Sequence, residues 1–405
     1  MFALYRALLA RRAARPLAVA CALAWLAFTS YGLAIILVVH AATRSFGLAG
    51  AAVAAFSAGS GLMAPARGRF IDRQGPHRLV LFTFAHGCAA SALVVTCLLH
   101  APAVALLCAA MVAGGVAPPL IATARTMWTK IAAPDLIKSA HALNASLADA
   151  AQLLSPALTG ALAAAFAPSL ALAVLIVGAT LAGAMIALTG RRRRLVDASA
   201  PAPPGRLVGV IADSPGLRTL VACDVAGGLW TGGLEVSVTA LAARHGAAEL
   251  AALPLSAMAV GGALASLWVG SRSVLPAADV RYLGGSLLVG ASLPLAMVGP
   301  SVGSVTCIAV VVGAGVGVLG VALFELLDHV VAPERAVEAF TWLTTGQAAG
   351  SAAGAAGAGA LVHGGTTVTF GVVGGCAVAA AAIAFIRRGT LTSDTSLDSA
   401  QSRRF

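Results

Sequence analysis

The sequence predicts an all-α polytopic membrane protein, and three observations point to this fold class. Hydrophobic residues make up 59% of the 405 residues and charged residues only 10%, whereas about 25% of a soluble globular protein is charged. The mean hydropathy is +0.93, and long apolar stretches recur along the chain. Most basic residues lie between these stretches, as they do in proteins that cross a bilayer repeatedly.

Twelve apolar stretches are long enough for transmembrane helices, which need about 20 residues to cross the hydrocarbon core. We expect these spans at 16–39, 46–66, 79–99, 102–124, 141–166, 168–190, 217–243, 249–270, 281–300, 302–327, 337–362 and 365–386. The first stretch is itself long enough to span, so no cleavable signal peptide is expected.

The charge distribution tests this division into spans. If the N-terminus is cytoplasmic, all 26 basic residues except Arg44 and Arg244 fall in cytoplasmic segments. A wrong number of spans would scramble this asymmetry. We therefore expect a multi-pass protein of the plasma membrane with both termini in the cytoplasm.

Composition divides the chain into four parts. The segment 191–216 opens with four arginines and continues with alanine, serine and proline, which is typical of a loop. We expect an N-terminal six-helix bundle at 1–190, a cytoplasmic linker at 191–216, a C-terminal six-helix bundle at 217–386 and a disordered cytoplasmic tail at 387–405. The net charge of +11 could suggest nucleic acid, but arginines in such positions are better suited to anionic lipid headgroups. No nucleic-acid partner is expected.

Short motifs repeat between the two predicted bundles. Ala133-Pro-Asp135 corresponds to Ala332-Pro-Glu334, and Gly160-Ala-Leu162 corresponds to Gly359-Ala-Leu361, both with an offset of 199 residues. A parallel repeat of two bundles is an architecture of secondary transporters, whose substrate site lies between the repeats near the midplane.

A charged connection lies between the second and third spans, within Gly68-Arg-Phe-Ile-Asp-Arg-Gln-Gly-Pro-His-Arg78. It resembles the signature loop of the major facilitator superfamily through Gly68, Phe70, Asp72, Arg73, Gly75 and Leu79. It departs from that pattern at Pro76 and His77, where the family usually has two basic residues. The resemblance implies twelve helices in two six-helix bundles and transport by alternating access.

In this family the signature loop forms part of an inner gate. The resemblance assigns that role to Gly68, Asp72, Arg73, Gly75 and Arg78. Arg125, at the end of the fourth span, could pair with Asp72 to hold the gate shut, or it could simply flank the membrane. The fourth span lacks the deeper arginine that the family often uses in proton transfer.

A second motif lies in the fifth span, at Ala151-Gln-Leu-Leu-Ser-Pro-Ala-Leu-Thr-Gly160. It resembles a degraded form of the fifth-span motif of drug/proton antiporters. Pro156 and Gly160 match, while Ser155 and Thr159 occupy positions of expected glycines. Proline bends a helix, and small residues let neighbouring helices approach. The resemblance favours export.

Few acidic residues lie within the spans, and each is costly there and so needs an explanation. Glu235, in the seventh span, is the first candidate, because a carboxylate in a partly dry cavity can bind and release a proton near neutral pH. Asp224 lies three turns earlier on the same face. Asp149 and Gln152 share a face of the fifth span. Each of these side chains could bind protons or substrate, or could have a structural role.

Aromatic residues on the first and seventh spans are further candidates. Trp25, Tyr31 and Trp230 lie on helices that line the central cavity in the family. They could stack against an apolar or aromatic substrate, or they could pack in the core or against lipid.

Other kinds of chemistry find no support in the sequence. The seven cysteines lie within apolar segments without a pairing pattern, and no cysteine–histidine cluster with the spacing of a metal site occurs. The glycines of the tenth span lack the lysine of a nucleotide-binding loop. We expect no metal, no cofactor and no enzymatic activity.

These observations together predict a monomeric secondary transporter whose partners are a small molecule, protons and the lipid bilayer. The expected activity is proton-coupled export of a small neutral or cationic molecule, with amphipathic molecules among the candidates. One alternative is an importer or facilitator with the same fold. Another is a membrane sensor or scaffold that transports nothing.

Overall fold

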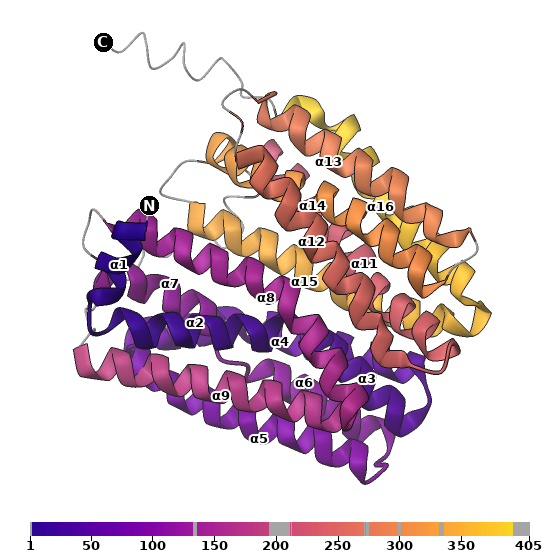
Figure 1. Ribbon diagram of the computed structural model, residues 1–405, viewed down its shortest axis with the longest axis horizontal. Coiled ribbons are helices and arrows are strands. Elements are labelled where there is room, and N and C mark those ends of the chain that lie inside the picture. The colour runs from indigo at the N-terminus through magenta and orange to yellow at the C-terminus, as the bar shows by residue number, and fades with distance from the viewer. Residues whose placement is uncertain are drawn as a thin grey trace.

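The computed structural model describes residues 2–132, 136–193, 211, 213–270, 272, 275–298, 301–331 and 336–391. These residues form helices and no strand (Figure 1). Most of the predicted linker, and the predicted tail from residue 392 on, lie outside them, as do the Ala-Pro-Asp and Ala-Pro-Glu motifs.

The first half of the chain, from α1 to α9, supplies the indigo to magenta helices of Figure 1. They are α1 (Phe2–Ala10), α2 (Ala14–Thr29), α3 (Tyr31–Thr43), α4 (Phe46–Gln74), η1 (Pro76–Arg78), α5 (Leu79–Leu98), α6 (Ala103–Gly115), α7 (Leu120–Ile131), α8 (Ile137–Ala165) and α9 (Pro168–Arg193).

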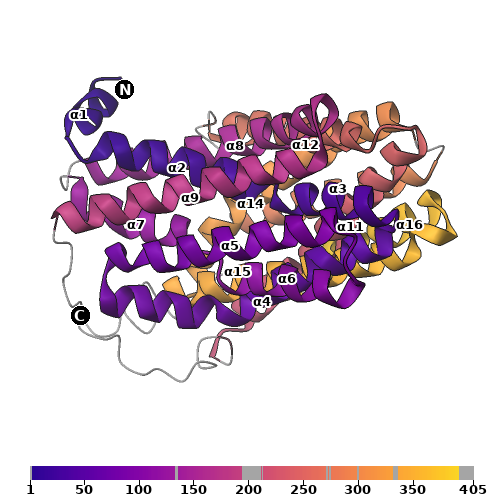
Figure 2. The same ribbon diagram turned by 90° about the horizontal axis from the view of Figure 1, so that it is seen from below.

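The second half, from α11 to η7, supplies the remaining helices. They are α11 (Pro215–Arg244), η3 (Ala248–Ala251), α12 (Ala252–Gly270), α13 (Ala278–Ser292), η4 (Leu293–Met297), α14 (Val302–Val330), α15 (Ala336–Leu361), η6 (Val362–Gly364), α16 (Thr366–Ile386) and η7 (Arg388–Thr390). Figure 2 shows that the long helices of both halves run along the same axis of the molecule.

The helices are consistent with the twelve predicted spans, since each predicted stretch contains at least one helix. Within the described residues, eight segments are long and apolar enough to cross a membrane, or nine if α2 and α3, which meet at 44°, form one span. The helices α8, α11 and α15 are not among them. Each packs against the opposite half of the chain, α8 on α12, α11 on α3 and α15 on α4, so these three need less apolar surface for lipid.

Two of the spans are broken. The first is interrupted at Ser30, whose backbone is not helical, between α2 and α3. The fourth is interrupted between α6 and α7, where Pro118 and Pro119 lack the N–H groups that would continue the helix. Pro156, by contrast, lies inside the continuous helix α8.

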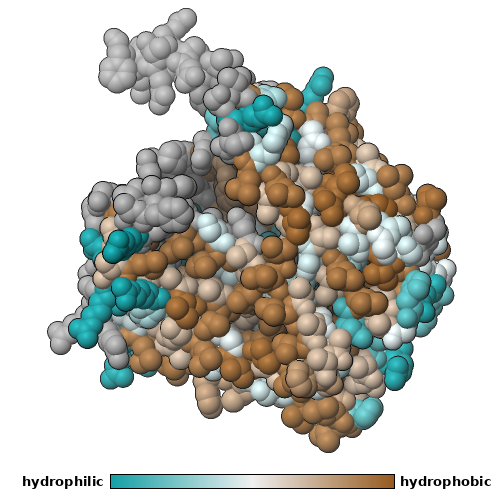
Figure 3. Space-filling view, viewed as in Figure 1, coloured by the Kyte–Doolittle hydropathy of each residue, from teal (hydrophilic) through white to brown (hydrophobic). Residues whose placement is uncertain are grey.

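The outer surface is apolar, as a bilayer requires. Figure 3 shows hydrophobic side chains over most of one face of the molecule. The exposed large hydrophobic residues come from helices of both halves and include Leu62, Phe84, Val104, Val177, Leu267 and Ile386. Such an extent of exposed apolar surface is typical of a protein that lies in lipid.

The two halves meet closely at one end, which we call the packed end, formed by the connections at 43–46, 165–168, 244–252 and 361–366. A side chain on Gly359 of α15 would place its Cβ 2.6 Å from the carbonyl oxygen of Phe46 in α4. A Cβ on Gly160 of α8 would lie 2.5 Å from that of Ala252 in α12. The repeated Gly-Ala-Leu motif therefore marks two of the places where one half packs against the other.

Candidate functional site

Glu235 lies where the second half contacts the break in the first span. Its carboxylate faces Gly32 of α3, and a Cβ on Gly32 would lie 2.5 Å from Oε2. The Glu235 side chain is half-buried. It makes no hydrogen bond or ion pair with any residue that the structure describes. An unpartnered carboxylate between the two halves is available to a proton or to a cationic group.

Two polar side chains extend the site along α11. Thr231 lies one turn before Glu235 and accepts a hydrogen bond from Gln347 of α15, with Nε2 and Oγ1 3.3 Å apart. Asp224 lies about 16 Å from Glu235 along the helix axis, on the same face. It is half-buried and, among the described residues, has no hydrogen-bond or ion-pair partner. The result is a polar face with two carboxylates and no described basic partner.

The aromatic residues of the first span lie mostly in the core. Tyr31 is buried, and its ring stacks between Phe28 and Phe56, with centroids 5.5 and 5.3 Å away. Trp230 is also buried and packs with apolar residues of α3 and α11. Trp25 is half-buried, and its Nε1 donates to Oδ1 of Asn144 at 3.4 Å. Of these three side chains, that of Trp25 is the most exposed.

A buried network of hydrogen bonds stabilises the chain where the fourth span is interrupted. His86 lies between Tyr31, whose hydroxyl is 2.9 Å from Nε2, and the carbonyl oxygen of Ala113, 2.9 Å from Nδ1. Because a carbonyl can only accept, Nδ1 carries a proton and Nε2 accepts from Tyr31. The network thus links the break in the first span to the end of α6.

Arg67 of α4 completes this network and is 6% exposed. Its Nη1 donates to the carbonyl oxygens of Gly114 and Gly115 at 2.7 and 2.9 Å, and its Nη2 to that of Ser60 at 2.8 Å. In an unbroken helix, the carbonyl oxygens of Gly114 and Gly115 would accept hydrogen bonds from the N–H groups of residues 118 and 119, but both of these residues are prolines. Arg67 replaces the two donors that the prolines lack.

The fifth-span motif joins α8 to both halves. Ser155 is buried, and its hydroxyl donates to the carbonyl oxygen of Leu26 in α2 at 2.5 Å. Gly160 permits the contact with α12 described above, and Pro156 is buried between them. Gln152 is exposed. The side chain of Asp149 lies outside the described part of the structure.

The signature loop is compact. Gly75 has φ +90° and ψ 160° and ends α4, a conformation that only glycine adopts readily. A Cβ on Gly68 would meet nothing within 4 Å. Arg78 and Arg125 are exposed. The side chains of Asp72 and Arg73 are outside the described part, so the pairing of Asp72 with Arg125 stays a prediction.

The second half contains an ion pair outside this site. Arg281 of α13 forms an ion pair with Glu325 of α14, which joins two helices of the second half. Among the described residues, no group of three or more histidine, cysteine or acidic side chains could hold a metal ion.

Sequence reasoning identified Glu235 and Asp224 but did not identify Gln347, His86 or Arg67 as parts of these networks. Gln347 could have been noticed as the one amide in the apolar eleventh span. The adjacent prolines at 118 and 119 indicate unpaired carbonyls, but nothing in the sequence shows that Arg67 would reach them.

Comparisons with known proteins agree with this architecture. The family model described as Major Facilitator Superfamily matches residues 17–355. No curated protein matches in sequence. A bacterial homologue of the iron transporter ferroportin, in an inward-facing state, superposes with a TM-score of 0.72 at 15% identity, covering 94% of this chain and 98% of that one. The nucleoside transporter NupG gives 0.70 at 11% identity, with 93% and 99% covered. The human organic anion transporter MFSD10 gives 0.62 at 15% identity, with 94% and 99% covered.

Proposed function

Because the chain belongs to the major facilitator superfamily, and is thus a membrane transporter rather than an enzyme, we propose that it exports a small neutral or cationic molecule in exchange for protons. Glu235 is the residue that carries this proposal. It binds either a proton or the cation, so that the two occupy the site alternately and their movements are coupled.

The surroundings of Glu235 support this role. Its carboxylate lies between α11 of the second half and α3 of the first, so its environment changes whenever the halves move relative to each other. It has no described cation to neutralise it. A proton, which is held more readily when the carboxylate is desolvated, is the simplest counter-charge in the absence of substrate.

The polar face of α11 supports a neutral or cationic substrate. Asp224 and Glu235 are acidic, and Thr231 and Gln347 offer hydrogen bonds without charge. An organic anion would meet two carboxylates on this face without a described basic residue to offset them. An amine or a neutral polar molecule could bind there favourably.

The orientation follows from the charge asymmetry of the sequence. The packed end carries Arg44 and Arg244, the two basic residues outside the predicted cytoplasmic segments, so we assign it to the outer side. The backbone contacts at Gly359 and Gly160 then close the outer side. This arrangement corresponds to an inward-facing carrier, ready to load its substrate from the cytoplasm.

The proposal is tested by the accumulation of a panel of lipophilic cations in cells that express the protein, with and without a proton uncoupler. Cells with the native chain should accumulate less of at least one cation, and the uncoupler should abolish the difference. Glu235→Gln should abolish it as well. Glu249→Gln, which removes a carboxylate at the packed end away from the site, is the matched control and should export normally.

The outcomes separate the alternatives. Saturable uptake that increases with expression would indicate an importer or facilitator and would overturn export. Normal export by Glu235→Gln would remove that residue from the mechanism. If Glu235→Gln and Asp224→Asn both leave the cellular phenotype of the protein intact and no substrate moves, the sensor or scaffold alternative is favoured.

A further inference from the structure

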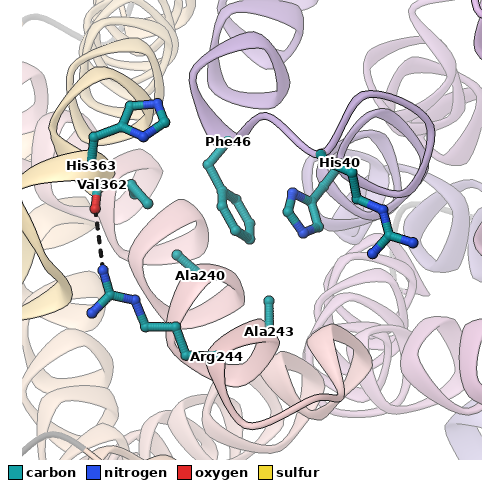
Figure 4. Close-up of a pocket in the computed structure, with 8 residues that line it drawn as sticks. His40, Phe46, Ala240, Ala243, Arg244, Val362 and His363 are labelled. Carbon is teal, nitrogen blue, oxygen red and sulfur yellow. Dashed lines mark hydrogen bonds between the residues drawn. The ribbon is translucent and has the colours of Figure 1, made fainter.

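A pocket of about 350 Å³ lies between the two halves at the packed end (Figure 4). Its walls come from both halves. The first half contributes His40, Arg44 and Phe46, and the second half contributes Arg244 and His363, with small apolar residues between them. In Figure 4 the rings of His40 and Phe46 lie side by side, and Arg244 and His363 lie across from them.

The lining is basic and contains no acidic residue. Arg44 and Arg244 form no ion pair within the described part of the chain. Arg244 donates only one long hydrogen bond, from Nη2 to the carbonyl oxygen of Val362 at 3.4 Å. The buried Nδ1 of His40 has no hydrogen-bond partner among the described atoms. The pocket therefore combines uncompensated positive charge with unused hydrogen-bonding groups.

Arg44 and Arg244 belong to opposite halves, and both are exposed, so each guanidinium can take up an anion from the solvent. An anion that contacts both would attract a residue of each half. Arginine is well suited to oxyanions, since its planar fork donates two parallel hydrogen bonds to a carboxylate or phosphate.

We propose that this pocket binds an oxyanion, a phosphate or carboxylate group, among Arg44 and His40 of the first half and Arg244 and His363 of the second. The volume exceeds that of inorganic phosphate, so the group can carry an organic body or waters. The stacked rings of His40 and Phe46, with centroids 3.8 Å apart, provide one wall for it.

Binding there would favour the conformation in which the packed end is closed. A ligand shifts an equilibrium towards the state that it binds more tightly, and this pocket exists only while the two halves are together. The anion would bind reversibly and stabilise the closed packed end on the outer side. Its binding depends neither on the transported substrate nor on proton coupling, so the test below is independent of the proposed function.

The test is binding of inorganic phosphate to the purified full-length protein in nanodiscs of phosphatidylcholine, a zwitterionic lipid. Equilibrium dialysis with radiolabelled phosphate measures binding, and thermal unfolding measures stabilisation. Sodium chloride at equal ionic strength controls for screening. We expect saturable binding and a rise in Tm that grows with phosphate concentration, as linkage requires. Arg44→Gln and Arg244→Gln should weaken the apparent affinity at least tenfold.

Two further variants make the result specific. Arg388→Gln, which removes an exposed arginine of η7, should bind phosphate like the native chain. Arg244→Lys, which keeps the charge but loses the fork, should bind with intermediate affinity and covers the case in which Arg244→Gln does not fold.

Nanodiscs that contain phosphatidylglycerol distinguish a lipid headgroup from a free anion. If the headgroup is the ligand, these nanodiscs should raise the Tm of the native chain more than that of Arg244→Lys, and that of Arg244→Gln least, and free phosphate should add nothing. No stabilisation by either source would overturn the proposal. So would equal phosphate binding by the native chain and both glutamine variants.

Discussion

Replacing Arg67 by methionine should destabilise the protein through the break in the fourth span. The side chain donates to the carbonyl oxygens of Gly114 and Gly115, and methionine fills similar space without a donor. The carbonyl of Gly114 keeps one bond, from the N–H of Ala117 at 3.0 Å, whereas that of Gly115 would have no described partner. A buried unsatisfied carbonyl costs about 1–3 kcal/mol, and each lost bond to a charged donor about 1.5–3 kcal/mol.

These terms overlap, so we expect a loss of about 2–4 kcal/mol in the free energy of unfolding. Thermal unfolding of the purified protein in detergent measures it, and the Tm should fall by about 2–5 °C. Arg78→Met is the matched control, because Arg78 is exposed. That change should cost no more than about 0.5 kcal/mol.

A double-mutant cycle tests the explanation itself. Replacing Pro118 and Pro119 together by alanine restores the two N–H groups that a continuous helix uses. In that background Arg67→Met should cost at least about 1 kcal/mol less than in the native chain, because the carbonyls have other donors. Equal costs in the two backgrounds, or a loss no larger than that of Arg78→Met, would refute the reasoning.

Three further predictions test other features of the structure. Gly75→Ala should lower stability by about 1–3 kcal/mol because of its positive φ, measured as a drop in Tm, whereas Gly68→Ala in open helical space should be neutral or slightly stabilising. Gly359→Ala forces a Cβ against the carbonyl oxygen of Phe46, so it should open the packed end. If Phe46 is replaced by cysteine, a membrane-impermeant thiol reagent should then label this cysteine more extensively. Unchanged labelling would contradict the close contact. Ser155→Ala should lower stability by about 1 kcal/mol, the typical worth of its hydrogen bond to α2, and an unchanged Tm would show that this bond contributes nothing.

The sequence predicted the helical membrane fold well, for a physical reason, whereas the role of Glu235 stays a prediction. Apolar length and the cost of a charge in lipid are properties of composition, which can be read one segment at a time. Membership of the superfamily followed from motifs of only a few residues, and the match over 17–355 confirms it. The finer subtype, a drug/proton antiporter, stays a prediction.

The orientation of each helix about its own axis was not predictable. In a soluble helix a polar face marks the side that meets water, but a membrane helix is apolar both towards lipid and towards its neighbours. Tyr31 and Trp230 illustrate this limit. Both were placed on cavity-lining helices, and both lie in the core, where Tyr31 serves the network around His86.

The break in the first span could not be predicted from the sequence for a related reason. No proline marks Ser30, and the bend there becomes visible only with the neighbours of α3 in place. Likewise, the repeated Gly-Ala-Leu motif was recognised as a sign of duplication. That both copies would lie at the contacts between halves follows from the three-dimensional arrangement alone.

Small residues bring α15 and α4 together, since Gly359 lies against Gly47 and Gly50, and Gly50 lies against Ala355. This has a consequence for the rate of the transport cycle. Glycine and alanine have no rotamers to release, so parting these backbones yields no side-chain entropy, and rejoining them requires no search for a matching set of rotamers. The barrier to this movement therefore depends mainly on lost dispersion contacts and on how readily water or lipid wets the separated surfaces. The temperature and the lipid composition of the membrane should consequently influence turnover more than any single side chain at this contact.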